Sequence, residues 1–360
     1  MSTSPDKLYH MGGAPVGCPE VGPRTSVINQ KICYFVDANN GSDSSDGFTW
    51  ASARATIQSA VTSANSNKHR LDNVDIYVAN GNYEETVTIT HTALGGTVAQ
   101  KEQSLVWQNM GSNCGYLGTL RIIGGAGVTG AGHNKWTCGV GSVDPCLYIG
   151  RPNVEVYGFN FQNDSGGVAA GSWSLTTESG GHAQEAMPSI HVQDQYNIEA
   201  AEPTQVLSNG AGNNVLIKNC RLNSGGVLNS GAKWVHVEDC MLEYCGYGVG
   251  MIANSKGRAS ESHVTGCKFS QNTYDIEHGY AICCWVEDCR FLTSGAQHLF
   301  PLAAHAASTF CVISNSEGST EAKFCSAKNS GWIAQNIGAY DGTANVSSAA
   351  TLTAASDFKP

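Results

Sequence analysis

The feature that most constrains the fold is a cysteine-centred repeat in the second half of the chain. Four segments align on one cysteine each: VLIKNCRLNSGG, VHVEDCMLEYCG, SHVTGCKFSQNT and WVEDCRFLTSG. Their cysteines, Cys220, Cys240, Cys267 and Cys289, follow one another after 20, 27 and 22 residues. A period of this size is typical of a solenoid in which each repeat forms one coil and the loops vary in length.

Apolar residues recur at fixed places around each cysteine. Those three positions before it are Ile217, Val237, Val264 and Val286. Those two positions after it are Leu222, Leu242, Phe269 and Phe291. The later position obeys the alternation of a strand, but the earlier one is out of phase, so we expect a bend just before each cysteine.

The bend position holds residue types that tolerate turn or left-handed backbone. They are Asn219, Asp239, Gly266 and Asp288. An earlier segment, VEVYGFNFQNDSGG, places Val156, Phe159 and Phe161 at the apolar positions. We therefore predict about ten coils stacked ~4.8 Å apart between residues 75 and 335, a rod roughly 50 Å long with buried thiols inside.

The N-terminal part predicts strands and one helix. Ile32 to Asp37 has the character of a strand, and Ile57, Ala60, Val61 and Ala64 have the i, i+3, i+4, i+7 spacing of an amphipathic helix. We place this helix at 52–66, where it would cap the open end of the solenoid. Two alternating strands, 74–78 and 86–90, follow and are separated by the turn at Asn80-Gly81.

Three stretches here, YFVDANNGSDSSDGFTW, ATIQSAV and IYVANGNYEETVTI, carry a resemblance. Over residues 33–90 the chain resembles the first-turn signature of the pectate-lyase-like right-handed parallel β-helix superfamily, which includes polysaccharide lyases, glycosidases and phage tailspikes. The resemblance implies an all-β, right-handed parallel β-helix solenoid with an N-terminal capping α-helix and an extended N-terminal arm. It also implies that the chain is a homotrimer.

We divide the chain into three parts. Residues 1–31, with Gly-Gly and four prolines, predict an extended anchor arm. Residues 32–337 form the β-helix, and residues 338–360, rich in Ala, Ser and Thr, form a C-terminal tail or cap. Polar or glycine-rich inserts are expected near 92–118, 124–146, 164–189, 196–213 and 246–260, where solenoids often carry binding loops.

Charge and composition exclude several partners. The net charge is −10 without any cluster of lysine and arginine, so we expect neither nucleic acid nor anionic membrane as a partner. No apolar run approaches the ~18 residues of a membrane helix, and residues 1–31 lack a secretory signal. There is no CxxC pair, so we expect no metal site and no cofactor, apart from calcium if the chain were a lyase.

Paired carboxylates are the candidates for catalysis, because glycan cleavage commonly needs one acid and one base or nucleophile. The pairs Glu238-Asp239 and Glu287-Asp288 share one register, and the Thr265-Gly266 coil separates them, so they should lie ~10 Å apart. Asp194 is a third candidate. The alternative is that all of these are solvated turn residues.

Other side chains are candidates for binding. Arg221, Met241, Lys268 and Arg290 come one position after the cysteines and should face outward. Arg221 or Arg290 could hold a sugar acid, or could simply pair with Glu238 and Glu287. Trp107, Trp136 and Trp173 could stack on sugar rings or anchor loops as buried indoles. His182 and His278 lie in polar surroundings without a recognisable partner.

The function predicted first is a structural protein of a bacteriophage virion, a capsid decoration or a tail spike. It would be assembled in the host cytoplasm, released by lysis, and docked on other virion proteins through residues 1–31. The enzyme motifs of the superfamily are not found, which favours a non-enzymatic role and leaves catalysis open. The alternatives are a polysaccharide depolymerase, either lyase or glycoside hydrolase, and a non-catalytic adhesin that binds host surface polysaccharide.

Overall fold

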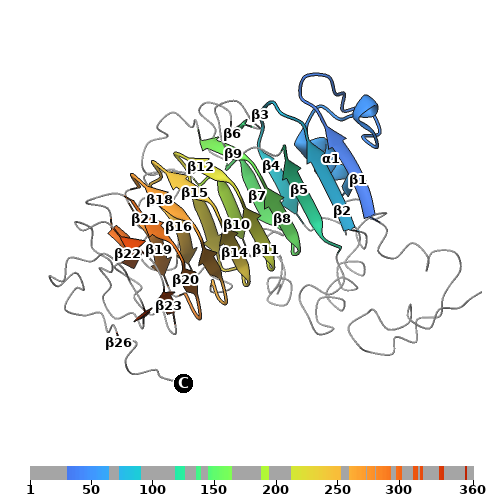
Figure 1. The fold of residues 1–360 in the computed structure, drawn as a ribbon. Coiled ribbons are helices and arrows are strands. Elements are labelled where there is room, and N and C mark those ends of the chain that lie inside the picture. The colour runs from blue at the N-terminus through green and yellow to red at the C-terminus, as the bar shows by residue number, and fades with distance from the viewer. Residues whose placement is uncertain are drawn as a thin grey trace, which may run out of the picture.

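The computed structural model shows a solenoid of short strands (Figure 1). It describes residues 31–64, 73–90, 118–125, 135–138, 145–163, 188–193, 212–252, 259–272, 274–279, 281–292, 297–301, 311–314, 317–318, 332–335 and 353–354. Within these ranges the strands form three parallel sheets, which we name A, B and C. The all-β, right-handed parallel β-helix predicted from the sequence is therefore confirmed.

Sheet A contains the strand that precedes each bend. Its strands, in spatial order, are β1 (Lys31–Val36), β2 (Asn73–Val78), β5 (Leu120–Gly124), β8 (Val154–Tyr157), β11 (Val215–Lys218), β14 (Val235–Glu238), β17 (His263–Thr265), β20 (Trp285–Glu287), β23 (Cys311–Ser314), β25 (Trp332–Gln335) and β26 (Thr353–Ala354). Each strand pairs in parallel with the strand of the next coil, so like positions stack on one another along the rod.

Sheet B follows each bend. Its strands, in order from the N-terminal end, are β3 (Asn82–Glu84), β6 (Lys135–Cys138), β9 (Asn160–Asn163), β12 (Arg221–Asn223), β15 (Met241–Glu243), β18 (Lys268–Ser270), β21 (Arg290–Phe291) and β24 (Glu317–Gly318).

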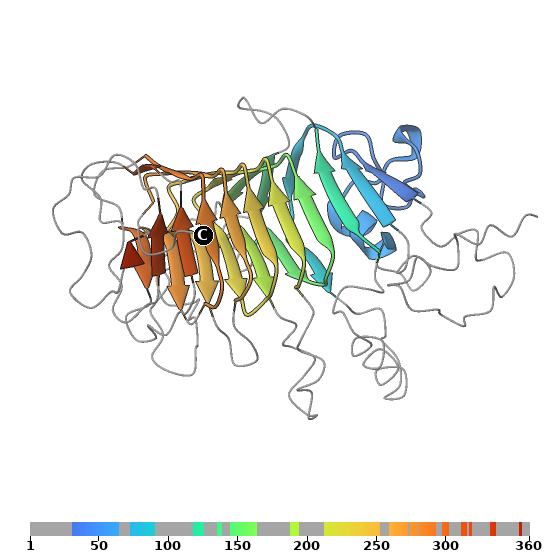
Figure 2. The ribbon, with the colours of Figure 1, turned by 60° about the horizontal axis from the view of Figure 1, so that its bottom comes forward.

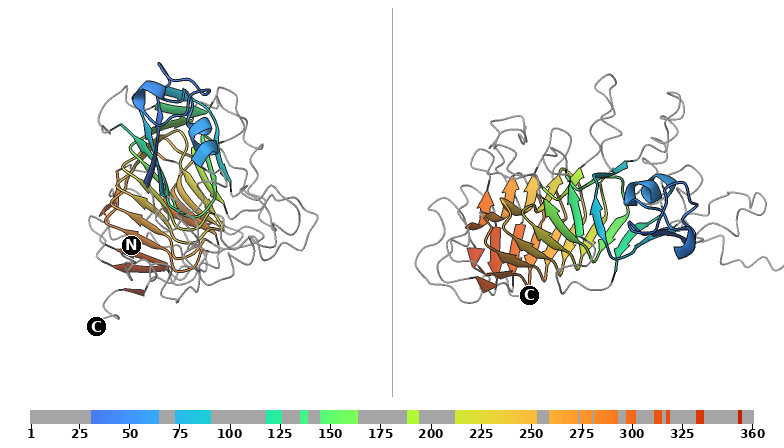
Figure 3. Two further views of the ribbon diagram at one scale, coloured as in Figure 1. Left: turned by 90° about the vertical axis from the view of Figure 1, so that its right-hand side faces the viewer. Right: turned by 90° about the horizontal axis from the view of Figure 1, so that it is seen from above.

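Sheet C completes each coil. Its strands are β4 (Val87–Thr90), β7 (Leu147–Gly150), β10 (Ile190–Gln193), β13 (Val227–Ser230), β16 (Tyr247–Ile252), β19 (Tyr274–Gly279) and β22 (Gln297–Pro301). Figures 2 and 3 show the strands of each sheet succeeding one another along the axis.

The core is the column that the repeat predicts. The four aligned cysteines are at most 2% exposed, and the apolar residues three before and two after each cysteine are equally buried. Each thiol donates to a backbone carbonyl; that of Cys240, for example, lies 3.2 Å from the oxygen of Glu238. Burial raises the pKa of the Cys220, Cys240 and Cys267 thiols well above the ordinary value.

The bends contain left-handed residues, as the sequence predicts. Between sheets A and B, Asn219, Asp239, Gly266 and Asp288 have φ angles of 54°, 51°, 66° and 52°. The structure adds two further corners of the same kind. Left-handed residues between sheets B and C are Ser224, Tyr244 and Gln271, and those between sheets C and A are Asn153, Asn214, Trp234, Glu261 and Cys283.

The predicted cap is confirmed, and its helix begins at Ile57 rather than at residue 52. Helix α1 (Ile57–Ala64) buries Ile57, Ala60, Val61 and Ala64 against β1, β2 and β4 at the N-terminal end of the rod (Figure 1). A carboxylate from the next coil caps its first turn, since Glu85 accepts the N–H groups of Ile57 and Gln58 at 2.8 and 3.0 Å. A short 3₁₀ helix, η3 (Trp50–Ser52), lies in the loop before α1.

Several local expectations need correction. The inserts expected at 124–146 and 246–260 contain β6 and β16, because these short strands carry little alternation of their own. The chain also forms β3 after the turn at Asn80-Gly81, so 74–78 and 86–90 belong to different sheets. Two residues of the tail form β26, which pairs with β25. Residues 1–30, where most of the anchor arm was predicted, lie outside the described residues.

Within the described ranges, no helix combines the length and the hydropathy needed to cross a bilayer. In the same ranges, no three histidine, cysteine, aspartate or glutamate side chains gather as metal ligands would.

Candidate functional site

The outer face of sheet A carries two columns of side chains, because alternate residues of each strand point away from the core. Strand pairing brings the members of each column into register. The first column is Cys33, Asp75, Arg121, Glu155, Leu216, His236, His263 and Trp285. The second is Phe35, Tyr77, Ile123, Tyr157, Lys218, Glu238, Thr265 and Glu287.

Three aromatic rings stack in the first column, and we call them the aromatic ladder. The rings of His236 and His263 are parallel within 3°, with centroids 4.9 Å apart, and Trp285 continues the stack at 4.5 Å and 16°. Both faces of the His263 ring are therefore covered by its neighbours. The three side chains are partly exposed, and each ring carries at least one nitrogen that can hydrogen-bond to a hydroxyl group.

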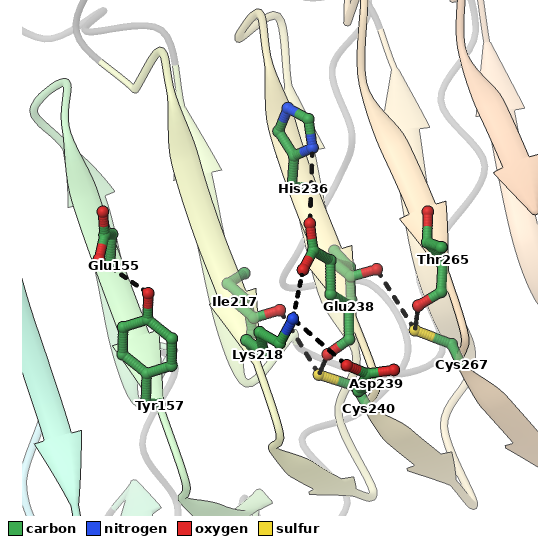
Figure 4. Close-up of polar contacts among 11 residues, drawn as sticks. Glu155, Tyr157, Ile217, Lys218, His236, Glu238, Asp239, Cys240, Thr265 and Cys267 are labelled. Carbon is green, nitrogen blue, oxygen red and sulfur yellow. Dashed lines mark hydrogen bonds and ion pairs between the residues drawn. The ribbon is translucent and has the colours of Figure 1, made fainter.

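Charged groups stand beside the ladder in the second column. The Lys218 ammonium lies 2.8 Å from Glu238 and 3.4 Å from Asp239 (Figure 4). These two carboxylates, Glu238 first, raise the pKa of Lys218. The Nδ1 atom of His236 is 3.9 Å from the other oxygen of Glu238, so one carboxylate links the lysine to the ladder.

Burial sets the protonation of the ladder. It lowers the pKa of His236, and the neighbouring His263 lowers it further, while Glu238 acts in the opposite direction. Burial also lowers the pKa of His263, against the influence of Glu287 and Glu238. Both imidazoles are therefore neutral at pH 7, and each offers one N–H donor and one acceptor nitrogen.

The corner between sheets C and A flanks the ladder. Trp234 and Glu261 each stand two residues before a ladder histidine, with φ angles of 55° and 50°. Left-handed backbone is costly for a bulky residue such as tryptophan. The partly buried Trp234 therefore holds, two residues before His236, a backbone conformation that is against its local preference.

The structure confirms the register predicted for the paired carboxylates. Glu238 and Glu287 both stack on Thr265, one from each side, which places them two strand spacings or ~10 Å apart. Asp239 and Asp288 are exposed at the left-handed corner residues. A Cβ atom at Gly266 would lie 2.6 Å from the Asp239 carboxylate, so the glycine gives this side chain room.

Arg221 and Arg290 face outward as expected, but they lie on sheet B, around the corner from Glu238 and Glu287. Arg221 pairs with Glu243 at 2.8 Å through Nε. Lys218 holds the Glu238 carboxylate instead, so the predicted pairing of Arg221 with Glu238 is wrong. The reason is that Glu243 belongs to the strand next to Arg221 in the same sheet.

Of the three tryptophans predicted to bind sugar, only Trp136 lies in the described part of the chain, and its ring is not available for stacking. Trp136 is 0% exposed in β6, and its indole donates to the carbonyl of Glu85 at 2.9 Å. Its suggested sugar-stacking role is therefore wrong, because strand β6 turns the ring into the core. Trp107, Trp173, Asp194 and His182 lie outside the described residues, and only the backbone of His278, in β19, is described.

Sequence reasoning missed the residues that give this face its character: Trp234, His236, His263 and Trp285. A signal was present, since His236, His263 and Trp285 each stand four positions before an aligned cysteine. In a strand, that position points away from the buried residue beside it, so aromatic rings there must stack on the surface.

No family model matches the chain, and no curated protein matches it. Solved structures do. A rhamnogalacturonan lyase superposes with a TM-score of 0.51 at 14% identity, covering 84% of this chain and 72% of that one. The pectin methylesterase PemA from Erwinia chrysanthemi gives 0.47 at 11% identity over 89% and 92%. The GH136 lacto-N-biosidase from Eubacterium ramulus gives 0.38 at 10% identity over 89% and 66%.

The likeness to the first of these structures concerns the fold. Together with the three parallel sheets, it shows that the chain has the pectate-lyase-like right-handed parallel β-helix fold. Because a fold of this kind hosts many activities, the function has to be argued from the outer face of sheet A.

Proposed function

We propose that the protein binds an extended polysaccharide on the outer face of sheet A. The observation that carries this proposal is the aromatic ladder beside Lys218 and Glu238, because ring nitrogens, an ammonium group and carboxylates together can bind a row of sugar hydroxyls. The groups are pre-organised, since strands fix their spacing and stacking fixes the rings.

The charge of this face indicates which class of polysaccharide it can bind. Carboxylates outnumber cations on the described part of it and of its two corners: Asp75, Glu155, Glu238, Asp239, Glu261, Glu287 and Asp288 stand against Arg121, Arg151, Lys218 and Lys233. The whole chain has the same sign, with a net charge of −10. A polyanionic glycan is therefore repelled, and neutral or amino-sugar polysaccharides are preferred.

Affinity electrophoresis tests this function. Native gels containing xylan, glucomannan, glycol chitosan or polygalacturonate would be run with the wild-type chain and Trp285→Ala. We expect a neutral or amino polysaccharide to retard the wild type and polygalacturonate to leave it unaffected. Trp285→Ala keeps the net charge, so non-specific electrostatic retardation would survive in it and specific retardation would be lost. Equal mobility of the two proteins in every gel would contradict the proposal.

Cleavage of the bound polysaccharide is the second candidate function, and the spacing of Glu238 and Glu287 favours it. Their ~10 Å separation lies at the upper margin for an inverting acid and base pair. Glu238→Gln and Glu287→Gln should then reduce the release of reducing ends by a far larger factor than they weaken retardation. Asp239→Asn and Asp288→Asn serve as the neighbouring controls. A retained polysaccharide that the wild type leaves intact would contradict cleavage.

The virion role remains a prediction, and so does docking through residues 1–31. Mass spectrometry of purified particles tests it, and absence of the chain from virions would contradict it. A glycan-binding face is compatible with a tail spike or adhesin as well as with a free enzyme.

A further inference from the structure

The N-terminal end of the rod displays a second group of aromatic side chains, which we call the N-terminal aromatic patch. It consists of Phe35, Trp50 and Tyr77. Phe48, in the same loop as Trp50, stacks instead on the buried Tyr34 ring at 5.2 Å. Phe48 and Trp50 are 50% and 53% exposed, among the most exposed large apolar side chains in the described part of the chain. Exposing so much aromatic surface costs free energy that burial would recover, so the patch calls for an explanation.

The loop that carries the patch is held rigidly. The Asp46 carboxylate accepts the N–H of Phe48 at 3.0 Å and the hydroxyl of Ser52 at 2.6 Å. Asp43 accepts the N–H groups of Ala55 and Thr56 at 3.0 and 2.9 Å. Trp50, which lies in this loop, therefore holds a fixed position before any ligand arrives, and little entropy is lost when it binds one.

Stacking continues the patch into sheet A. The Trp50 ring lies 4.7 Å from Phe35, centroid to centroid, and Phe35 stacks on Tyr77 at 5.7 Å. From Tyr77, strand register leads through Ile123 and Tyr157 to Lys218 in the candidate site. The patch and the aromatic ladder thus belong to one face of the rod, with their outer strands, β1 and β20, seven strand spacings or ~34 Å apart.

The charged groups between them are paired with one another. Arg121 bridges Glu155 at 2.7 Å and Asp75 at 3.4 Å. The hydroxyl groups of Tyr77 and Tyr157 donate to these same two carboxylates at 3.1 and 2.8 Å. Because Asp75, Arg121 and Glu155 already have partners in one another and in the tyrosine hydroxyl groups, an uncharged chain can cross this stretch without separating an ion pair.

We propose that the N-terminal aromatic patch is a distal subsite for the same polysaccharide, which runs along the rod axis from Trp50 to Trp285. The exposed face of a pre-organised tryptophan suits the CH-rich face of a sugar ring. The inference rests on the proposed function, and it specifies the ligand further as a long linear chain. A short oligosaccharide occupies only one end of the face.

Trp50→Ala tests the inference against chain length. The polysaccharide that retards the wild type would be compared, intact, with fragments of it shorter than ~30 Å, which cannot span the seven strand spacings. We expect Trp50→Ala to weaken retention of the intact chain roughly tenfold, the size of one lost aromatic contact, and to leave competition by the fragments unchanged. Trp50→Phe should restore most of the retention. Leu292→Ala, which truncates a side chain 52% exposed beside sheet B, is the matched control and should have no effect.

The outcomes separate the two proposals. If Trp50→Ala retains the intact polysaccharide as tightly as the wild type, while Trp285→Ala loses it, the distal subsite is overturned and the binding face stands. If no polysaccharide retards the wild type, both are overturned. Circular dichroism and the unfolding midpoint show whether Trp50→Ala is folded, and Trp50→Phe keeps the test valid if it is not.

Discussion

The imidazole ring of His236 lies parallel to that of His263, within 3° and with centroids 4.9 Å apart. This contact keeps two titratable groups against each other on a half-buried surface. A positive charge on either ring is disfavoured by burial, and for His236 also by the charge of its neighbour. The stack therefore favours two neutral rings, and protonation of either ring at low pH destabilises it.

Replacing one ring should shift the titration of the other. His263→Phe preserves the stack and its burial but removes the charge, so the pKa of His236 should rise toward its ordinary value. The measurement is an NMR titration of the His236 ring protons in both proteins. Lys268→Met removes a cation from sheet B and serves as the control. A His236 pKa that is unchanged or falls in His263→Phe would contradict the assigned cause.

Polysaccharide retention should follow the same protonation. Both histidine pKa values are lowered below 6.5, so both rings are neutral above pH 6.5. The neutral stack is lost as the pH falls further, through these lowered pKa values. We expect retention to weaken in acid, since two cationic rings repel and their acceptor nitrogens disappear. Affinity electrophoresis between pH 7 and pH 4.5 measures this. The double variant His236→Gln/His263→Gln should lose the pH dependence, and a persistent dependence would place its origin elsewhere.

His191 links the folding free energy to pH in sheet C. Its ring is 5% exposed and lies edge-on to Tyr148, and burial lowers its pKa to about 3. The unfolded chain binds the proton with an ordinary pKa of 6.5, so the stabilisation from a neutral His191 is full above pH 6.5 and falls toward pH 3. The free energy of unfolding should decrease by up to about 1.4 kcal/mol per pH unit in this window.

Chemical denaturation at several pH values measures that slope. His191→Leu keeps an apolar side chain of similar reach and removes the titration, so its curve should be flatter between pH 6 and pH 4. His236→Leu reports the contribution of a less buried histidine. Identical slopes for the wild type and His191→Leu would show that the ring is not neutral in the folded state.

The Glu85 carboxylate should be worth about 1 to 3 kcal/mol, because it satisfies the first N–H groups of helix α1 and faces the positive end of the helix dipole. Glu85→Ala leaves the N–H groups of Ile57 and Gln58 without this acceptor. Urea unfolding gives the loss. Glu84→Ala removes an exposed carboxylate next to it and should cost little, so equal losses in the two variants would contradict the capping role.

These features differ in how far the sequence alone could reveal them. The bends at Asn219 and Asp239 were predictable, because left-handed conformation is a local preference of those residue types. The cap by Glu85 was not, since the carboxylate and Ile57 are brought together only by coil stacking. The aromatic ladder could have been predicted, because His236, His263 and Trp285 recur four positions before the aligned cysteines. Recognising it as a surface feature would also have required the prediction that this position faces solvent. The left-handed conformation of Trp234 could not be predicted, since tryptophan rarely adopts a positive φ angle.

The thiols should fall into two reactivity classes. Cys220, Cys240 and Cys267 are buried and have raised pKa values, whereas Cys33 and Cys283 are half-buried. Because the thiolate is the reacting species, iodoacetamide at pH 8 should modify Cys33 and Cys283 in the native protein and spare the buried column. Peptide mass spectrometry locates the adducts, and labelling in urea is the control. Native labelling of Cys240 as fast as of Cys283 would contradict the packing of the column.

Trp234 offers a test of whether backbone strain serves binding. Its two predecessors at the corner between sheets C and A are Asn153 and Asn214, and asparagine adopts the left-handed conformation more easily than tryptophan does. Trp234→Asn should therefore raise the free energy of unfolding by about 1 kcal/mol. If the tryptophan is kept for the ligand, the same variant should weaken polysaccharide retention, since Trp234 stands two residues before His236 of the ladder.

Tyr244→Asn separates strain from binding. Tyr244 has a φ angle of 55° and is 56% exposed, but it lies at the corner between sheets B and C, away from the ladder. It should gain stability to a similar extent and bind as the wild type does. Both substitutions relieve the same kind of backbone strain, so a difference in binding between them reports on where each residue lies relative to the ladder. A stabilised Trp234→Asn that still binds fully would mean that the strained tryptophan has no part in glycan recognition.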